Sequence, residues 1–212
     1  MSHDATAFIK ANLQLQAVPG LPEISLYIAH SGSRLSHLAK AKTGDAAAPY
    51  WAYAWAGGLA LAHHFRAHPE LIAGRTVLDL GAGSGLVGIA ATMAGATAIA
   101  AEIDAYGRAA IALNATANCC MIDLVEIDLD GPPPIDIAVI AGGDVFYNAE
   151  TAGRMLPFLQ RCHAVGITVL IGDPQRRDLP VDQLVPIASY AVGDVGDARQ
   201  TTQRQASVYR LR

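Results

Sequence analysis

The segment of residues 77–85, V-L-D-L-G-A-G-S-G, limits the possible folds of this chain more than any other part of its sequence. Residues 76–80 are apolar and include β-branched types, which is typical of a short buried strand, and residues 86–94 have the composition of a helix. Three glycines at alternate positions between them let backbone N–H groups approach a ligand with no Cβ in the way. The segment therefore predicts a strand, a ligand-binding turn and a helix.

The spacing of these glycines and the acid before them narrow the class of ligand. The pattern is G-x-G-x-G, and Leu86 stands in place of the third glycine of the dinucleotide fingerprint G-x-G-x-x-G. Asp79, at the end of the strand, would repel a pyrophosphate and attract an amine or sulfonium cation. S-adenosylmethionine carries both cations and is the cofactor that this turn favours. The alternative is a tight turn whose glycines serve packing alone.

A second acid argues against that alternative. Glu102 ends the apolar run of residues 97–101, twenty-three positions after Asp79. In a doubly wound sheet, ligands bind outside the carboxyl ends of the strands, and an acid about 20 residues past the glycine turn accepts hydrogen bonds from ribose hydroxyls. Asp104 competes for this role, but we favour it as the N-cap of a helix that begins near residue 105.

These two motifs, V-L-D-L-G-A-G-S-G and A-A-E-I-D, resemble the first two motifs of class I S-adenosylmethionine-dependent methyltransferases. The resemblance implies an α/β fold with a doubly wound, mostly parallel seven-stranded sheet and a C-terminal antiparallel strand. It also implies a single cofactor, S-adenosylmethionine, held at the carboxyl edge of that sheet.

Composition agrees with one α/β domain and excludes several other classes. The chain has 212 residues, of which 52% are hydrophobic and 16% charged, so a well-filled core is expected and extensive disorder is not. The formal net charge is −4, and no Lys- or Arg-rich run is present. A nucleic-acid partner is therefore disfavoured.

Cysteine usage and hydropathy bear on the compartment. Cys119, Cys120 and Cys162 lack the paired spacing of a zinc site, so we assign no metal and expect a reduced, cytoplasmic protein with buried thiols. The first residues do not have the pattern of a signal peptide. Residues 80–101 are uncharged, yet their glycine turn fits a helix and a strand better than a membrane span, so no membrane partner is expected.

Strands and helices alternate after residue 75 with the spacing of βαβ units. The last two strands should form an antiparallel hairpin joined by the polar residues 194–205. The expected strands are 76–80, 97–101, 124–127, 135–141, 167–172, 184–191 and 206–211. The expected helices are 59–67, 86–94, 105–119 and 149–162.

The N-terminal part differs in character from the rest. We divide the chain into an appendage, residues 1–48, that packs on the domain as a candidate lid over the cofactor, and a methyltransferase domain, residues 49–212. In the appendage, residues 8–15 read as a short helix or strand and residues 24–28 as a strand. Residues 43–49 read as a flexible loop.

An aromatic segment, residues 49–58 (P-Y-W-A-Y-A-W-A-G-G), contains both tryptophans of the chain. Indole faces near a cationic methyl donor or an ammonium group would contribute about 0.5 to 2 kcal/mol of cation–π attraction. Burial in the core is the competing explanation, and it applies more to Trp51 than to Trp55. Gly57 and Gly58 indicate a close backbone approach beside Trp55. His63 and His64, which follow, are read as packing residues.

A third acidic constellation follows the strand predicted at residues 135–141. Asp144 would lie at the same sheet edge as Asp79 and Glu102, where it could orient an acceptor amine and receive its proton. Because the same charge also favours the ammonium form, positioning and desolvation would have to supply much of the rate. Phe146 and Tyr147 could flank the amine. The alternative is a strand-end Asp with aromatic core residues.

Three patterns extend the resemblance to one branch of the family. They are P-Y-W-A-x-x-W-x-G-G, the D-x-x-Y motif within G-D-V-F-Y, and G-D-P-Q-R at residues 172–176, and together they are similar to the branch that methylates a lysine of the electron transfer flavoprotein β subunit. The sequence departs from that pattern with Glu rather than Asp at position 102 and with Gln175 where a glycine is expected.

The resemblance implies a role for each matching position. For the cofactor, it implies that Asp79, Gly81 and Gly83 hold the methionine end, Glu102 the ribose, Trp55 the wall and Asp128 the adenine amino group. At the acceptor it implies Asp144 and Tyr147 as catalytic residues, with Trp51, Phe146, Asp173 and Arg176 binding or admitting the substrate.

Three functions of different classes follow from the sequence. The leading one is a protein-lysine N-methyltransferase with the flavoprotein β subunit as a candidate partner. The second is an N-methyltransferase for a small amine, which a closed pocket over Tyr147 would favour. The third is a cofactor-binding module without catalysis.

Overall fold

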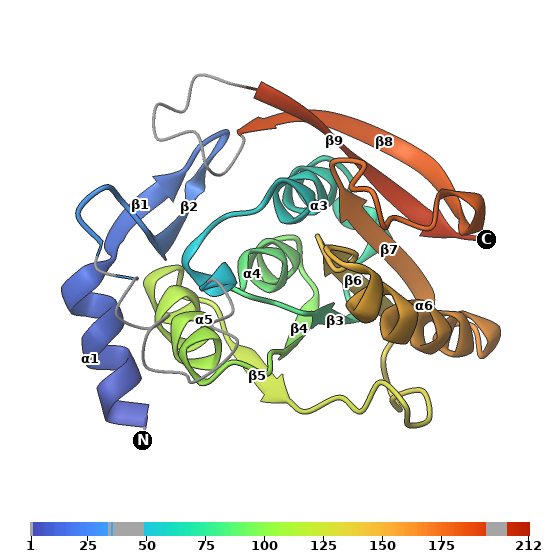
Figure 1. Cartoon of the computed structure of the whole chain (residues 1–212), viewed down its shortest axis with the longest axis horizontal. Coiled ribbons are helices and arrows are strands. Elements are labelled where there is room, and N and C mark those ends of the chain that lie inside the picture. The colour runs from blue at the N-terminus through green and yellow to red at the C-terminus, as the bar shows by residue number, and fades with distance from the viewer. Residues whose placement is uncertain (1, 34, 36–48, 194–202) are drawn as a thin grey trace.

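The computed structural model describes residues 2–33, 35, 49–193 and 203–212, which form one mixed sheet flanked by helices and a small N-terminal sheet. The main sheet has the strand order β5-β4-β3-β6-β7-β9-β8 (Figure 1). Only β9 runs against its neighbours; the other adjacent pairs are parallel. The predicted fold class is confirmed. The strands are β3 Thr76–Leu80, β4 Thr97–Ala101, β5 Ile122–Val125, β6 Val139–Gly143, β7 Thr168–Asp173, β8 Leu184–Gly193 and β9 Gln203–Leu211.

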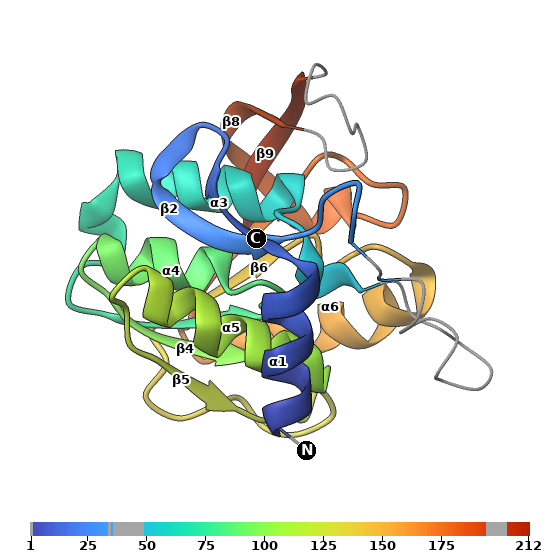
Figure 2. The same cartoon turned by 90° about the vertical axis from the view of Figure 1, so that its left-hand side faces the viewer.

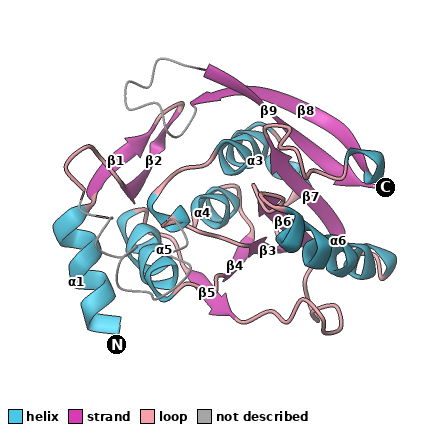
Figure 3. Cartoon of the chain, in the orientation of Figure 1, coloured by secondary structure: helices cyan, strands magenta, loops and turns pink. Residues whose placement is uncertain are grey.

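Helices cover both faces of this sheet, because alternate strand residues point to opposite sides. Val77 and Val139 pack under α3 and α4, whereas Leu78 and Ile140 face α6. Figure 3 shows α3, α4 and α5 together on one side of the strands and α6 on the other. In the described ranges, no helix is long and apolar enough to cross a bilayer. The helices are α3 Ala56–Ala67, α4 Leu86–Met93, α5 Ala105–Ala117 and α6 Ala149–Ala164, with 3-10 turns η1 Tyr50–Ala52, η2 Pro69–Leu71 and η3 Val181–Gln183.

The N-terminal elements are α1 Ser2–Asn12, β1 Gln14–Val18 and β2 Leu21–Ile28. The two strands pair with each other, and α1 lies against α5 (Figure 2). Side chains of α5 satisfy the backbone of β2: Asn118 Oδ1 accepts from the Ser25 N–H at 2.8 Å, and Asn114 Oδ1 accepts from the Tyr27 N–H at 2.7 Å. The helix-or-strand segment predicted at 8–15 is the end of α1 and the start of β1. The loop predicted at 43–49 and the boundary at 48 fall, except for residue 49, outside the described residues, as does most of the 194–205 connection.

Several predicted boundaries were wrong where an apolar run continued outside its strand. The strand predicted at 135–141 begins only at Val139, because Ile135 is 86% exposed and Asp136 has a φ of +62°. The strand predicted at 124–127 begins two residues earlier, at Ile122. The expectation of buried thiols holds for Cys162 but not for Cys119, which is exposed.

The first turn of α3 contacts the ends of β6 and β7 backbone to backbone. A Cβ built on Gly57 would overlap the carbonyl oxygen of Gly172, and one on Gly143 would lie 2.7 Å from the Cα of Gly58. Gly57, Gly143 and Gly172 therefore have no room for a side chain. This contact fixes the N-terminus of α3 at the carboxyl edge of the sheet.

We predict that Gly57→Ala lowers the free energy of unfolding by at least about 3 kcal/mol, because its Cβ would have to push two backbones apart. Gly153→Ala is the matched control: Gly153 lies exposed in α6, where a Cβ would meet nothing within 4 Å. That change should raise stability by up to about 1 kcal/mol. Chemical denaturation of both variants measures the difference, and equal stability of the two would contradict the backbone contact.

Candidate active site

Hydrogen bonds join the glycine turn to the end of the neighbouring strand, β4. The N–H groups of Gly81 and Ala82 both donate to the carbonyl oxygen of Ala101, each at 3.0 Å. Gly81, Gly83 and Gly85 all have positive φ, which only glycine adopts at little cost. The turn therefore lies at the carboxyl ends of β3 and β4, as the sequence predicted.

Glu102 joins this turn to the next helix. Its Oε2 accepts a hydrogen bond from the Gly83 N–H and its Oε1 one from the Asp104 N–H, both at 2.8 Å. The side chain is half-buried, so it lies at the surface of the edge. Asp104 caps α5 by accepting from the Tyr106 N–H at 2.7 Å, which confirms the capping interpretation.

Asp79 lies beneath the turn, and its carboxylate does not reach the surface. It is 1% exposed, and its Oδ2 accepts from the Gly88 N–H of α4 at 2.8 Å. Burial raises the pKa of Asp79 from an ordinary value of 3.8 to about 7; the nearby Glu102 adds to the shift and the Gly88 hydrogen bond opposes it. The expectation that this carboxylate faces a ligand is corrected: in this structure it lies beneath the turn and fixes α4 to β3.

Asp144 accepts hydrogen bonds from two parts of the chain, the N-terminus of α3 and Arg176. Its Oδ2 accepts from the N–H groups of Gly57 at 2.6 Å and Gly58 at 3.1 Å, so it binds the N-terminus of α3. Its Oδ1 accepts from Arg176, from Nη2 at 2.7 Å and from Nε at 3.1 Å. Asp144 itself has a φ of +57°, and its N–H donates to the Gly172 carbonyl at 2.9 Å.

These contacts change how Asp144 can act. The side chain is 8% exposed, and burial raises its pKa although Arg176 and the two α3 amides pull it down. The prediction was a carboxylate available to an acceptor amine. In the structure both oxygens already have donors, so an amine reaches Asp144 only if Arg176 gives way.

Arg176 comes from the loop that follows β7. Its backbone N–H donates to Asp173 Oδ1 at 2.6 Å, and the preceding Gln175 has a φ of +66°, the conformation for which the family pattern uses glycine. Asp173 is fully buried, and its Oδ2 has no hydrogen-bond partner among the residues that the structure describes; burial raises its pKa to about 6. Asp173 therefore shapes the loop from inside, and its predicted role in binding or admitting the substrate stays a prediction.

An exposed aromatic group stands beside the Asp144–Arg176 pair. Trp55 lies with its ring centroid 5.7 Å from the Arg176 guanidinium carbon, and its Nε1 donates to the Tyr50 carbonyl at 2.7 Å. Tyr50 packs on Trp55 at 5.6 Å and on Tyr147 at 5.3 Å between ring centroids. Tyr50 and Tyr147 are 43% and 46% exposed. Two predicted site residues, Trp55 and Tyr147, thus belong to one aromatic group. Tyr50, which contacts both, was not predicted as a site residue; only its place in the aromatic segment could have indicated it.

Three other predicted site residues do not reach this group. Trp51 is 3% exposed and stacks on Tyr106, in the core between α1 and α5. Phe146 is fully buried in the cluster under α6, so neither can flank a substrate. Asp128 lies three residues beyond the end of β5, exposed, and its Oδ1 accepts from the Asp130 N–H at 2.9 Å to close a local turn. Its predicted adenine contact stays a prediction.

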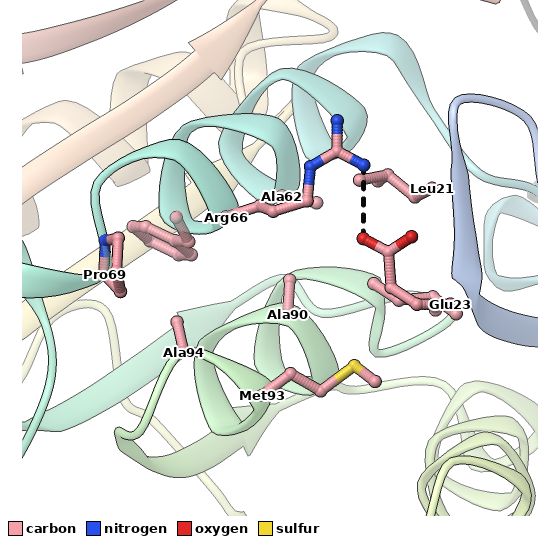
Figure 4. A pocket seen from close by; sticks show the side chains of 10 residues that line it. Leu21, Glu23, Ala62, Arg66, Pro69, Ala90, Met93 and Ala94 are labelled. Carbon is pink, nitrogen blue, oxygen red and sulfur yellow. Dashed lines mark hydrogen bonds and ion pairs between the residues drawn. The ribbon is translucent and has the colours of Figure 1, made fainter.

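A cavity of about 340 Å³ lies away from this edge, toward the C-terminal ends of α3 and α4. Figure 4 shows its apolar lining, with an ion pair between Arg66 and Glu23 across one side at 3.2 Å. Because α3 begins at Ala56 beside Asp144 and these side chains come from its far end, the cavity opens at the opposite edge of the sheet. It has no acid of the glycine-turn site in its lining, which includes Leu21, Ile24, Ala62, Phe65, Ala90 and Met93.

Comparisons with known proteins agree with the motifs. A family profile described as ribosomal protein L11 methyltransferase matches residues 68–141. The electron transfer flavoprotein beta subunit lysine methyltransferase of Xenopus laevis is 39% identical over 153 residues, covering 69% of this chain and 62% of that protein. A Caenorhabditis elegans homolog of that enzyme is 30% identical over 178 residues, covering 74% of this chain and 71% of that one. The chain belongs to the family of class I methyltransferases that includes these two relatives.

The extent of the match differs between members of this methyltransferase family. The chain spans 62% of the Xenopus laevis relative and 50% of the Homo sapiens one, to which it is 38% identical over 136 residues. Among solved structures, a Synechocystis magnesium protoporphyrin IX methyltransferase with bound S-adenosylhomocysteine superposes with a TM-score of 0.51 at 14% identity, covering 73% of this chain and 81% of that one. That likeness shows the fold alone.

The buried Asp79 should make stability depend on pH. Its folded pKa of about 7 lies above the ordinary 3.8, so its contribution is present below pH 4 and is lost as the pH rises to about 7. Asp79→Asn keeps an acceptor for Gly88 and cannot ionise. We predict that its free energy of unfolding, relative to the unsubstituted protein, increases between pH 5 and pH 8 in urea denaturation.

Asp182→Asn, at an exposed position in η3, controls for the change in net charge. A difference between Asp79→Asn and the unsubstituted protein that stays constant over this pH range would contradict a raised pKa of the buried Asp79.

Proposed function

We propose that this chain transfers a methyl group from S-adenosylmethionine to a lysine side chain of another protein, with the electron transfer flavoprotein β subunit as the first candidate. The observation that carries the proposal is the shared edge: the glycine turn with Glu102 lies at the ends of β3 and β4, and Asp144 with its aromatic neighbours follows β6. A cofactor site and an acceptor site would be adjacent there. The names of the relatives, at 37–39% identity for the vertebrate proteins, support the protein substrate.

The residues at the turn fit a cationic cofactor. At Gly83 the turn has no Cβ, and one built there would lie 3.8 Å from the Trp51 Cα, so η1 passes beside the turn. Gly81 and Gly83 would contact the methionine end, Glu102 the ribose hydroxyls, and the charge of Asp79 would favour the cations from below. Ile103, 99% exposed between two acids, offers an apolar side chain to the adenine. Bound there, S-adenosylmethionine supplies a methyl group on a sulfonium.

The chain's own part of the reaction is to bind, orient and deprotonate the amine. A lysine has an ordinary pKa of about 10.4, so a proton must leave before the nitrogen lone pair can attack. Trp55, Tyr50 and Tyr147 would hold the side chain through their ring faces and exclude water. Asp144, whose pKa burial raises, would receive the proton. Correct placement of the amine would supply most of the rate.

The exposure of the aromatic group favours a protein substrate over a small amine. Tyr50 and Tyr147 form an open surface on which a lysine of a folded partner could lie, whereas a small-molecule enzyme usually encloses its ligand. The three cysteines are free thiols, which suits a reducing compartment such as the cytoplasm.

The substrate assignment is tested by incubating the purified chain with S-adenosylmethionine and the purified electron transfer flavoprotein β subunit. We expect intact-mass and peptide analysis to find methyl groups on lysine of the β subunit. Tyr147→Ala removes the ring that would hold the lysine, and its matched control is Leu71→Ala, a similarly exposed apolar side chain of η2 outside the site; only the first should slow transfer. Transfer from labelled cofactor to the small-molecule fraction of a host lysate, with none to the β subunit, would contradict the protein substrate.

The two acids should separate cofactor binding from turnover. We predict that Asp79→Ala weakens S-adenosylmethionine binding by more than about tenfold, a loss of about 1.4 kcal/mol. Asp144→Asn should leave that affinity within about threefold and lower turnover by about 100-fold or more. Asn is chosen because its side-chain oxygen can still accept from the α3 amides, whereas Ala would leave them unpaired. Calorimetry showing normal affinity in Asp79→Ala would overturn the cofactor site.

A further inference from the structure

The guanidinium of Arg176 is bound in the way a substrate cation would be. Two of its nitrogens donate to Asp144 Oδ1, at 2.7 and 3.1 Å, and its central carbon lies 5.7 Å from the Trp55 ring centroid. A carboxylate on one side and an indole face on the other is a recognition site for an organic cation. The exposed pair of Tyr50 and Tyr147 continues the same wall.

The backbone of Arg176 is fixed while its side chain has a route to solvent. The Asp173 carboxylate holds the Arg176 N–H at 2.6 Å, and Gln175 turns the chain in a left-handed conformation just before it. The Arg176 side chain is 27% exposed, so it borders solvent where it pairs with Asp144. The next residue, Arg177, points elsewhere: its side chain is 87% exposed and pairs only weakly with Asp178, at 3.4 Å.

We propose that Arg176 is a stand-in for the acceptor amine: its guanidinium fills the cation site of Asp144 and Trp55, and the lysine ammonium of the substrate displaces it. This inference rests on the proposed function, because it identifies the acceptor site of that reaction. It assigns to Arg176 the opposite of the substrate-binding role that the sequence suggested.

An arginine is chemically suited to this position. Its guanidinium stays protonated at any physiological pH and has no lone pair available, so it can lie beside a methyl donor without reacting. It also balances the buried charge of Asp144 until the substrate arrives, and an uncompensated buried carboxylate is costly. A lysine ammonium restores the same ion pair on Asp144, so the exchange loses little electrostatic energy.

The displaced state has a balanced chemical route. The ammonium gives its proton to the Asp144 carboxylate, which passes it to water. The amine lone pair then forms the N–C bond as the S–C bond breaks, and the electron pair of that bond stays on sulfur to give S-adenosylhomocysteine.

The substitution Arg176→Lys tests the proposal within one chain. A lysine Nζ falls where the guanidinium carbon of arginine lies, so R176K places a methylatable amine in the proposed acceptor site. We expect R176K, incubated with S-adenosylmethionine alone, to gain a methyl group at position 176, at a rate independent of protein concentration. R177K is the matched control, one residue along and exposed, and it should stay unmodified at position 177.

Three measurements distinguish a failure of this proposal from a failure of the proposed function. Calorimetry first establishes that R176K binds S-adenosylmethionine. If it binds, and the unsubstituted chain methylates the flavoprotein β subunit, an unmodified position 176 overturns the stand-in. Equal modification of R176K and R177K overturns it as well. If the β subunit is never methylated but position 176 is, the acceptor site stands and the substrate assignment fails.

A second variant tests displacement itself. R176Q removes the competing cation while its amide can still donate to Asp144. We expect it to lower the KM for the acceptor protein severalfold, with unchanged affinity for S-adenosylmethionine, whereas R177Q leaves both as they were. An increased KM in R176Q would show that Arg176 binds the substrate directly and would overturn the proposal.

Discussion

The carboxylate of Asp144 is the interaction on which this edge of the molecule depends. The first N–H groups of a helix have no partner within it, and those of Gly57 and Gly58 are buried where α3 meets the ends of β6 and β7. Asp144 supplies their acceptor and, being anionic, suits the positive end of the helix. The same carboxylate holds Arg176, so the position of α3 and the position of the Arg176 side chain are set together.

This arrangement also explains why aromatic side chains gather there. Trp55 directly precedes α3, so fixing the helix N-terminus fixes its indole over Arg176. Tyr50 begins η1, and the hydrogen bond that its carbonyl accepts from Trp55 Nε1 holds it beside the indole. Two further acids, Asp79 and Asp173, are buried beneath this edge with raised pKa values. Acidic side chains thus gather at this edge, and their carboxylates would favour the proposed sulfonium cofactor and amine acceptor.

The sequence predicted well whatever depends on local pattern. The strand, glycine turn and helix of residues 76–94, the Asp104 cap and the mostly parallel sheet follow from periodicity and turn chemistry within a few residues. The sequence did not predict the exposure of side chains where packing between distant segments determines it. Phe146 and Trp51 look identical to functional aromatics in the sequence, yet α6 buries one and α1 with α5 the other. The pairing of Asp144 with Arg176, 32 positions apart, had no local signal.

A cationic cofactor bound at the glycine turn beside Asp144 would be seen in amide NMR of the whole chain with added S-adenosylmethionine. We expect large shifts for the backbone amides of residues 81–85 and 102–104, smaller ones at η1, and none around the cavity near Arg66. Shifts confined to that cavity, or no saturable shifts at all, would contradict it.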